Sequence, residues 1–269
     1  MEQISGLKYS LRRQAWQTLT KVPKITLYFW IVKLLTTAMG EATSDYMVLR
    51  FNPYLAVMAG FAVFVIALVI QFRKPHYVAW AYWLAVAMVA VFGTMAADVI
   101  HIQFGVPYAI STIFFAMVLA VVFTAWYKSE GTLSIHSVYT RSREAFYWAA
   151  VLATFAMGTA AGDLAAYTLH LGFLTSGILF GVVFALPALA YWLFDLNPIL
   201  SFWLAYIMTR PFGASFADWI GKSHSVGGLA YGDSKVALIL TALIVILVAY
   251  LGLTGKDQPA HQVATQDRL

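Results

Sequence analysis

The chain has 269 residues, of which 61% are hydrophobic and only 11% charged, and its formal net charge is +5 at pH 7. A soluble globular domain carries about 25% charged residues, so this composition excludes a soluble enzyme, and the dominance of apolar residues excludes a disordered chain. The absence of cysteine excludes a disulfide-stapled secreted domain. We therefore expect an all-helical polytopic membrane protein whose partner is the lipid bilayer and not a nucleic acid.

In chain order, the sequence begins with a basic segment, residues 1–24, which is expected to be cytosolic or interfacial. Eight apolar stretches follow, and each is long enough to cross a bilayer as a helix, the form in which backbone groups pair within the segment. The tail, residues 254–269, is polar and is expected to be disordered and cytosolic. The expected spans are residues 25–49, 54–72, 77–100, 108–127, 146–169, 173–194, 199–220 and 236–253.

Basic residues are divided unevenly between the two ends of these spans, and an excess of Lys and Arg marks the cytoplasmic side. We therefore expect a bacterial cytoplasmic membrane protein with both termini in the cytoplasm. Twelve basic residues lie on the side of the N-terminus: Lys8, Arg12, Arg13, Lys21, Lys24, Arg73, Lys74, Lys128, Arg141, Arg143, Lys256 and Arg268. Three lie on the opposite side: Arg50, Lys222 and Lys235.

One pattern recurs in every odd-numbered span: a tryptophan, nine residues, a glycine, three residues, a small residue and an aspartate. Four ungapped copies of such a pattern indicate internal repeats. They divide the chain into two-helix repeats at residues 25–72, 77–127, 146–194 and 199–253. The copies contain Trp30, Gly40 and Asp45; Trp83, Gly93 and Asp98; Trp148, Gly158 and Asp163; and Trp203, Gly213 and Asp218.

Four tandem copies of a two-helix unit, each with this tryptophan, resemble a bacterial membrane-protein family defined by a repeat of unknown function. Residues 21–45 are typical of the first repeat of that family. The resemblance covers about residues 20–255. It implies an architecture and no activity, so it assigns no functional residue.

Each repeat runs out and back, so all four motif helices point the same way, as in parallel repeats related by an axis along the membrane normal. We predict that these helices form an inner ring and that the more apolar even-numbered spans lie outside. The motif glycines allow close helix contact in a bilayer. We assign repeat packing to these glycines and to the tryptophans, which also fit an aromatic belt at the inner interface or the lining of a cytoplasmic vestibule.

Each motif ends in an aspartate that points about 100° away from the small residue before it. Because a carboxylate facing lipid is costly, we expect the four aspartates to share an interior site toward the outer surface. Alternatively, they only cap helix ends, or an internal salt-bridge network only holds the bundle together. The predicted ion-binding residues are Asp45, Asp98, Asp163, Asp218, Glu41, Thr94 and Thr159, with Lys33 and Arg210 as charge partners.

Two spans depart from the pattern. In span one, Lys33, Thr37, Glu41 and Asp45 recur every four residues and form a polar stripe. In span seven, Pro211 removes a backbone hydrogen bond and should kink or interrupt the helix near mid-membrane, which makes Pro211 a predicted gating residue.

Five carboxylates against two cations leave an excess of three negative charges within the spans. Oxygen ligands without cysteine suit a hard or borderline divalent cation such as Mn²⁺ or Mg²⁺, and His101, His170 and His224 lie near the same mouth. No enzyme signature or organic cofactor motif is present. We expect a transporter that binds a divalent metal cation, with proton coupling. The alternative is a non-transporting sensor or assembly protein whose acidic ring is structural.

Overall fold

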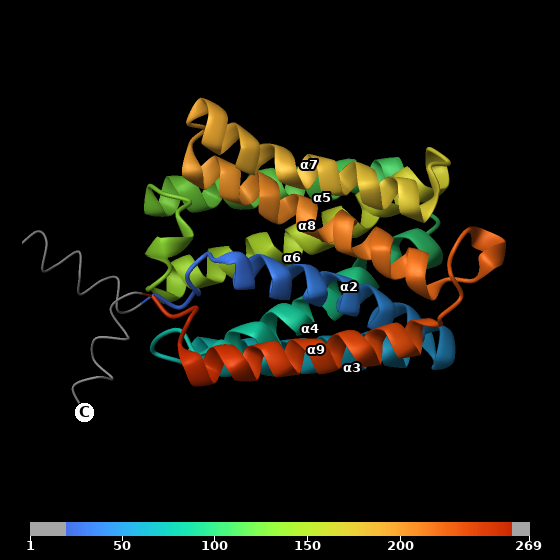
Figure 1. Ribbon diagram of the computed structural model, residues 1–269, viewed down its shortest axis with the longest axis horizontal. Helices are drawn as coiled ribbons and strands as arrows, with labels where there is room; N and C mark the ends of the chain where they lie inside the picture. The colour runs from blue at the N-terminus through green and yellow to red at the C-terminus, as the bar shows by residue number, and fades with distance from the viewer. Residues whose placement is uncertain (1–19, 260–269) are drawn as a thin grey trace, which may run out of the picture.

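The computed structural model describes residues 20–259, and the side chains of all of these except residues 102 and 103. Within this range the chain forms eight long helices and no strand (Figure 1), which confirms the predicted all-helical fold. The helices are α2 (Leu27–Arg50), α3 (Pro53–Arg73), α4 (Ala79–Asp98), α5 (Tyr108–Glu130), α6 (Arg141–Asp163), α7 (Gly172–Phe194), α8 (Pro198–Gly221) and α9 (Asp233–Thr254).

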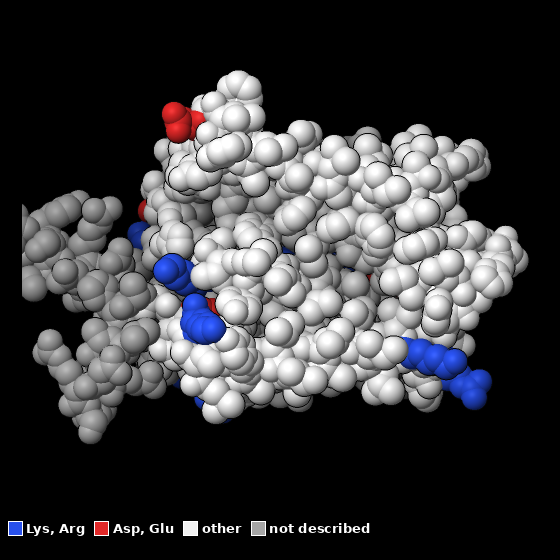
Figure 2. Space-filling model, in the orientation of Figure 1, with Lys and Arg blue, Asp and Glu red and all other residues white. Residues whose placement is uncertain are grey.

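Six of these helices are long and apolar enough to cross a membrane. The other two, α2 and α8, have 24 residues each but carry charged residues along their length. On the face shown in Figure 2, charged side chains gather at the two ends of the molecule, and the broad band between them is uncharged apart from glimpses of buried atoms. These features are consistent with a multi-pass membrane protein.

Local sequence determines where several helices begin. Helices α3 and α8 start at the same dipeptide, because the Asn52 and Asn197 side chains each accept two backbone N–H groups of the first turn. Pro53 and Pro198 then occupy the first helical position, where a missing N–H is tolerated. At the far end of α5, Gly131 adopts a left-handed conformation with a φ of 70° and ends the helix.

The four motif helices form a closed ring, because α2 and α6 each pack on both α4 and α8. Each outer helix covers the motif helix of the next repeat: α3 lies on α4, α5 on α6, α7 on α8, and α9 returns to α2. In the most apolar 18-residue window of the spans that contain α4 and α6, 61% and 67% of the residues are buried, against 17–22% in the corresponding windows of the outer helices. The predicted inner ring is therefore confirmed, and the overlap of neighbouring repeats closes it.

Each motif glycine lies against the next helix of the ring. A side chain at these positions would overlap the neighbouring helix, so the absence of a Cβ sets how closely the helices approach. The pairs in ring order are Gly40 with Ala90, Gly93 with Phe155, Gly158 with Arg210 and Gly213 with Thr37.

The motif tryptophans pack inside the bundle. Trp83, Trp148 and Trp203 are no more than 3% exposed, and only Trp30 is half-buried. The indole of Trp203 donates a hydrogen bond to the Leu133 carbonyl at 2.9 Å. A belt at the lipid interface is therefore the wrong interpretation for the three buried tryptophans, because ring contacts between helices exclude them from the lipid-facing surface.

The two ends of the described chain meet at one end of the bundle. The backbone N–H of Lys24 donates to the Asp257 carbonyl, and that of Lys21 donates to the Val138 carbonyl, at 2.8 and 2.9 Å. The Lys21 ammonium also pairs with Glu144 and is buried with it. This chain-terminal end is thus closed by residues 20–24, which lie between the loop before α6 and the segment after α9.

The tail predicted to be disordered from residue 254 is folded in its first part. Asp257 is only 1% exposed and accepts a hydrogen bond from the Tyr77 hydroxyl, an interaction that composition alone does not reveal. Residues 260–269, and residues 1–19 of the predicted N-terminal segment, lie outside the described residues.

Replacing Gly40 with alanine should lower the free energy of unfolding by about 1–3 kcal/mol, as overpacking does elsewhere. The new Cβ would lie 2.8 Å from the carbonyl carbon of Ala90, and backbone cannot move aside without separating α2 from α4. Thermal unfolding in detergent micelles measures the effect.

The matched control is Gly252→Ala on α9, where a Cβ meets nothing within 4 Å. This variant should be neutral or gain up to about 1 kcal/mol from helix propensity. Equal stability of the two variants would contradict the close approach.

Candidate cation site

The acidic ends of the motif helices come together at the end of the bundle opposite the chain termini. One carboxylate oxygen from each of Glu41, Asp45 and Asp218 lies within 4.8 Å of the others. Asp98 and Asp163 are the last residues of the other two motif helices, α4 and α6, at the same end of the ring. The structure therefore brings the four motif aspartates and Glu41 into one group, which we call the acidic cluster.

Arg210 of α8 connects the whole ring at the inner edge of the acidic cluster. Its guanidinium donates hydrogen bonds to the Glu41 carboxylate, to the Thr94 hydroxyl and, at 2.7 Å, to the Thr159 hydroxyl. A further bond of 3.4 Å reaches the Thr37 carbonyl. One side chain that is 1% exposed therefore links α8 to α2, α4 and α6.

The two threonines are oriented for this role. Each hydroxyl donates its proton to the backbone carbonyl four residues earlier, Thr94 to Ala90 at 2.9 Å and Thr159 to Phe155 at 3.1 Å. The hydroxyl oxygen is then free to accept from Arg210, because a hydroxyl combines one donor with two lone pairs. The predicted ion ligands Thr94 and Thr159 are thus engaged by the guanidinium in this conformation.

Lys33 does not pair with the acids, which corrects its predicted role as a charge partner. Its ammonium lies 3.9 and 4.2 Å from the ring centroids of Phe155 and Tyr206. Within residues 20–259, no carboxylate forms an ion pair with it. Lys33 precedes Glu41 by eight residues, or about 12 Å along the helix. The planar guanidinium of Arg210 reaches Glu41 instead, and it matches a carboxylate better than an ammonium does.

Lys222 is a member of the site that the sequence reasoning missed. Its ammonium forms an ion pair with Asp45 and lies 3.9 Å from Asp218 and 4.0 Å from Asp233. Burial alone would lower the pKa of Lys222, but the charges of Asp45 and Asp218 outweigh burial and raise this pKa well above its usual range. The spacing of four residues from Asp218 is the signal that points to this pair.

Two carboxylates of the acidic cluster form no ion pair with any residue that the structure describes. Arg210 pairs with Glu41, and Lys222 pairs with Asp45 and Asp218. Among the residues the structure describes, Asp98 and Asp163 form no ion pair, and both are half-buried. With all five acids ionised, the two cations leave an excess of three negative charges.

Helix geometry near the acids differs from the prediction at Pro211. Helix α8 continues through Pro211, so the predicted interruption is wrong, and the ring of Pro211 lies beside Gly158. Irregular geometry occurs instead in α4 and α6, which change to the π-helices η1 (Val99–Gln103) and η3 (Leu164–Thr168) directly after Asp98 and Asp163. Single π-helical turns often occur at functional sites.

Two histidines at this end of the bundle, His101 and His224, contact backbone carbonyl groups of the loops. Nδ1 of His101 lies 3.2 Å from the Val106 carbonyl oxygen, and Nδ1 of His224 lies 2.8 Å from that of Gly228. His170 has a φ of 54° just before α7. The carboxylates, not these histidines, make up the group that has metal-ligand spacing within residues 20–259.

The ring and the fourfold motif agree with a comparison against protein families. The family model described as Repeat of Unknown Function (DUF347) matches residues 28–77, 81–132, 146–196 and 201–257. The chain belongs to this family. Each matched segment of the DUF347 chain holds one motif helix and one outer helix, so the sequence repeat is also the structural unit. No curated protein and no solved structure matches this chain.

In this DUF347 protein, Arg210→Met should lower the free energy of unfolding by about 3–5 kcal/mol, because it leaves Glu41 as an uncompensated buried charge. The double variant Glu41→Gln with Arg210→Met should be more stable than Arg210→Met alone. The coupling energy between Glu41 and Arg210 is measured by denaturant unfolding in micelles of the parent protein, the two single variants Glu41→Gln and Arg210→Met, and the double variant.

The exposed Arg50 at the end of α2 provides the control, and Arg50→Met should stay within about 0.5 kcal/mol of the parent protein. Strictly additive losses for Glu41 and Arg210 would refute the coupling between them.

Proposed function

We propose that this protein is a membrane transporter with eight spans that carries a hard or borderline divalent cation, such as Mn²⁺, and that the acidic cluster binds the cation as cargo. The observation that carries the proposal is a cluster of carboxylates that outnumbers its ion-paired cations, in which Asp98 and Asp163 form no ion pair with a described residue. Carboxylate oxygens are the ligands that such cations prefer. A cation bound there would relieve the mutual repulsion of the acids.

The proposed location is a bacterial cytoplasmic membrane with both termini in the cytoplasm. The excess of basic residues on the side of the termini supports this orientation. The meeting of residues 20–24 with the segment after α9 supports the placement of both termini on one side. The acidic cluster then faces the outside, so a cation from outside reaches the carboxylates before it reaches Arg210.

The Arg210 guanidinium lies inside the ring, where it donates hydrogen bonds to residues of α2, α4 and α6 at once. Passage of a cation therefore requires the guanidinium to move. Gly158, which has no side chain, lies directly beside the Arg210 side chain. Release of the cation would leave several carboxylates close together. Protonation of some of these coupled carboxylates is the simplest way to relieve the repulsion between their negative charges. We propose cation–proton exchange on this basis.

Lys222 occupies the outer side of the cluster as a tethered cation. Its ammonium lies between Asp45 and Asp218, where a divalent ion would bind to the same oxygens. An incoming ion must therefore displace it. Helix α8 ends at Gly221, so Lys222 begins the outer loop and can withdraw without rearrangement of the ring.

Mn²⁺ uptake into proteoliposomes tests the proposal directly. Asp98→Asn and Asp163→Asn should each reduce uptake at least about tenfold, because each removes one uncompensated carboxylate, and tenfold corresponds to about 1.4 kcal/mol. The control is Asp195→Asn at the opposite end, where the residue is exposed and has a φ of 51° that asparagine also adopts.

The same assay tests the displacement of Lys222. Lys222→Met should lower the Mn²⁺ concentration for half-maximal uptake, whereas the exposed Lys235→Met should not change it.

Full uptake by the folded Asp98→Asn and Asp163→Asn variants would reject the acidic cluster as the cation site. No uptake of any cation by the parent protein would reject transport.

A structural role for the acidic cluster, in a membrane sensor or assembly protein, is the second candidate. The bonds from Arg210 to all three other motif helices favour it, since such a network stabilises a bundle without any cargo. Under this alternative, Asp98→Asn and Asp163→Asn would change the unfolding temperature and the parent protein would carry no flux.

A further inference from the structure

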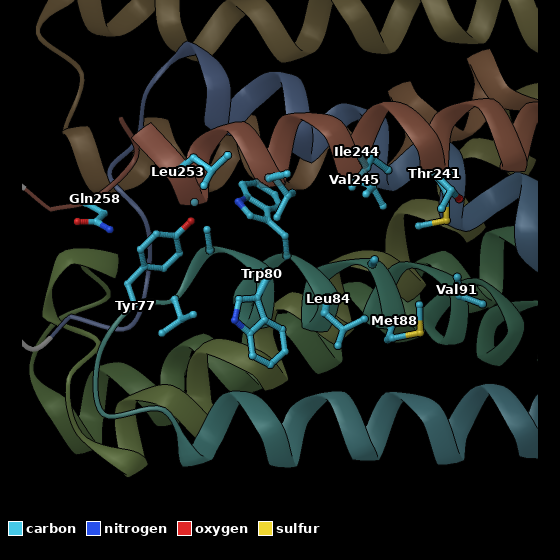
Figure 3. Close-up of a pocket in the computed structure, with 18 of the residues that line it drawn as sticks. Tyr77, Trp80, Leu84, Met88, Val91, Thr241, Ile244, Val245, Leu253 and Gln258 are labelled. Atoms are coloured by element: carbon cyan, nitrogen blue, oxygen red, sulfur yellow. The ribbon is translucent and has the colours of Figure 1, made fainter. Parts of the chain in front are cut away.

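A groove opens between α4 and α9 (Figure 3). Its volume is about 1150 Å³. Leu84, Met88 and Val91 line it from α4, and Ile244 and Val245 line it from α9. Most residues of the outer helix α9 are exposed, and Leu253 at the groove is 89% exposed, so in a membrane the groove opens toward lipid.

The groove has the length of one bilayer leaflet. Its lining residues on α4 extend from Ala79 to Val91, a separation of twelve residues that corresponds to about 18 Å of helix. The hydrocarbon core of a bilayer is about 30 Å thick, so one leaflet contributes about 15 Å. An acyl chain lying in the groove from the chain-terminal end would therefore reach the middle of the membrane.

The basic groups of the groove lie at its chain-terminal end, whereas the polar residues that line it farther along are the threonines Thr43 and Thr241. His76 and Gln258 line this end, and Trp80 forms its rim. The Lys74 ammonium lies 4.6 Å from the centroid of the Trp80 ring, and the preceding Arg73 is the exposed last residue of α3. Tryptophan is enriched at membrane interfaces, and Lys and Arg there attract anionic headgroups.

We propose that the groove is a binding site for an anionic phospholipid. One acyl chain lies along the apolar residues between α4 and α9, and the headgroup phosphate lies at Lys74 and His76. The match of length, apolar lining and basic rim carries this assignment, and none of these depends on transport. Met39 and Thr43 of α2 also line the groove on either side of Glu41 in the sequence, so a bound chain would contact the helix that holds the acidic cluster.

Native mass spectrometry of the full chain, released from nanodiscs of mixed phosphatidylglycerol and phosphatidylcholine, tests the proposal. The parent protein should retain one phosphatidylglycerol in strong preference to phosphatidylcholine. Gly252→Leu should reduce retention at least fivefold, because this glycine lines the groove and a Cβ there meets no atom within 4 Å. The added side chain thus fills the groove without disturbing the ring.

Charge variants separate the headgroup from the acyl chain. In the double variant Lys74→Gln with His76→Gln, the retention of phosphatidylglycerol should fall close to that of phosphatidylcholine, so the selectivity between the two lipids is lost. The exposed Lys128→Gln on α5 is the control and should leave it unchanged. If Gly252→Leu does not fold, a phosphatidylglycerol with a photoreactive acyl chain should label Met88 or Val91 in the parent protein.

Three results would overturn the assignment: no lipid retained by the parent protein, equal loss of selectivity in the Lys128 control, or a dimer whose second copy excludes lipid. Failure of Mn²⁺ uptake with lipid retention intact would reject the transport proposal alone.

Discussion

A charge buried in an apolar bundle must find its partners inside that bundle, and in this protein one arginine meets that requirement for four helices. Arg210 reaches Glu41, Thr94 and Thr159 only because the motif glycines let the helices approach closely. Gly158 faces the aliphatic part of the Arg210 side chain itself. Charge compensation by Arg210 therefore depends on the close packing of the motif helices. The same packing places the acidic ends of these helices next to one another.

The fourfold repeat builds a nearly symmetric scaffold around a centre that is not symmetric. The position after the motif glycine holds Glu41, Thr94, Thr159 and Ala214 in the successive repeats. Thus one repeat supplies the acid and two supply hydroxyls, while the last provides only a small side chain but contributes Arg210. Each repeat alone would bury unpaired polar groups, so the chemistry of the site exists only when the ring closes. The packing of α9 on α2 completes that closure.

Sequence reasoning predicts the parts of this fold that depend on spacing within one helix. Helix length, the parallel direction of the repeats and the shared interior of the aspartates follow from periodicity and from the cost of charge in lipid. Sequence reasoning does not predict contacts that depend on how far neighbouring helices are shifted along their axes relative to one another. Lys33, a predicted charge partner of the acids, lies against the rings of Phe155 and Tyr206 instead, and Arg210 pairs with Glu41. Lys222 and Asp257 lie in segments that read as ordinary loop and tail, and their partners come from distant repeats.

The central claim is that the acids left without a cationic partner hold a divalent cation inside the ring. Anomalous diffraction from crystals soaked in Mn²⁺ tests it most directly. The account predicts one anomalous peak inside the ring of α2, α4, α6 and α8, in contact with Asp98 and Asp163, together with movement of Lys222 away from Asp45 and Asp218. A ring with no peak at saturating Mn²⁺, in which Lys222 keeps its place, would contradict it.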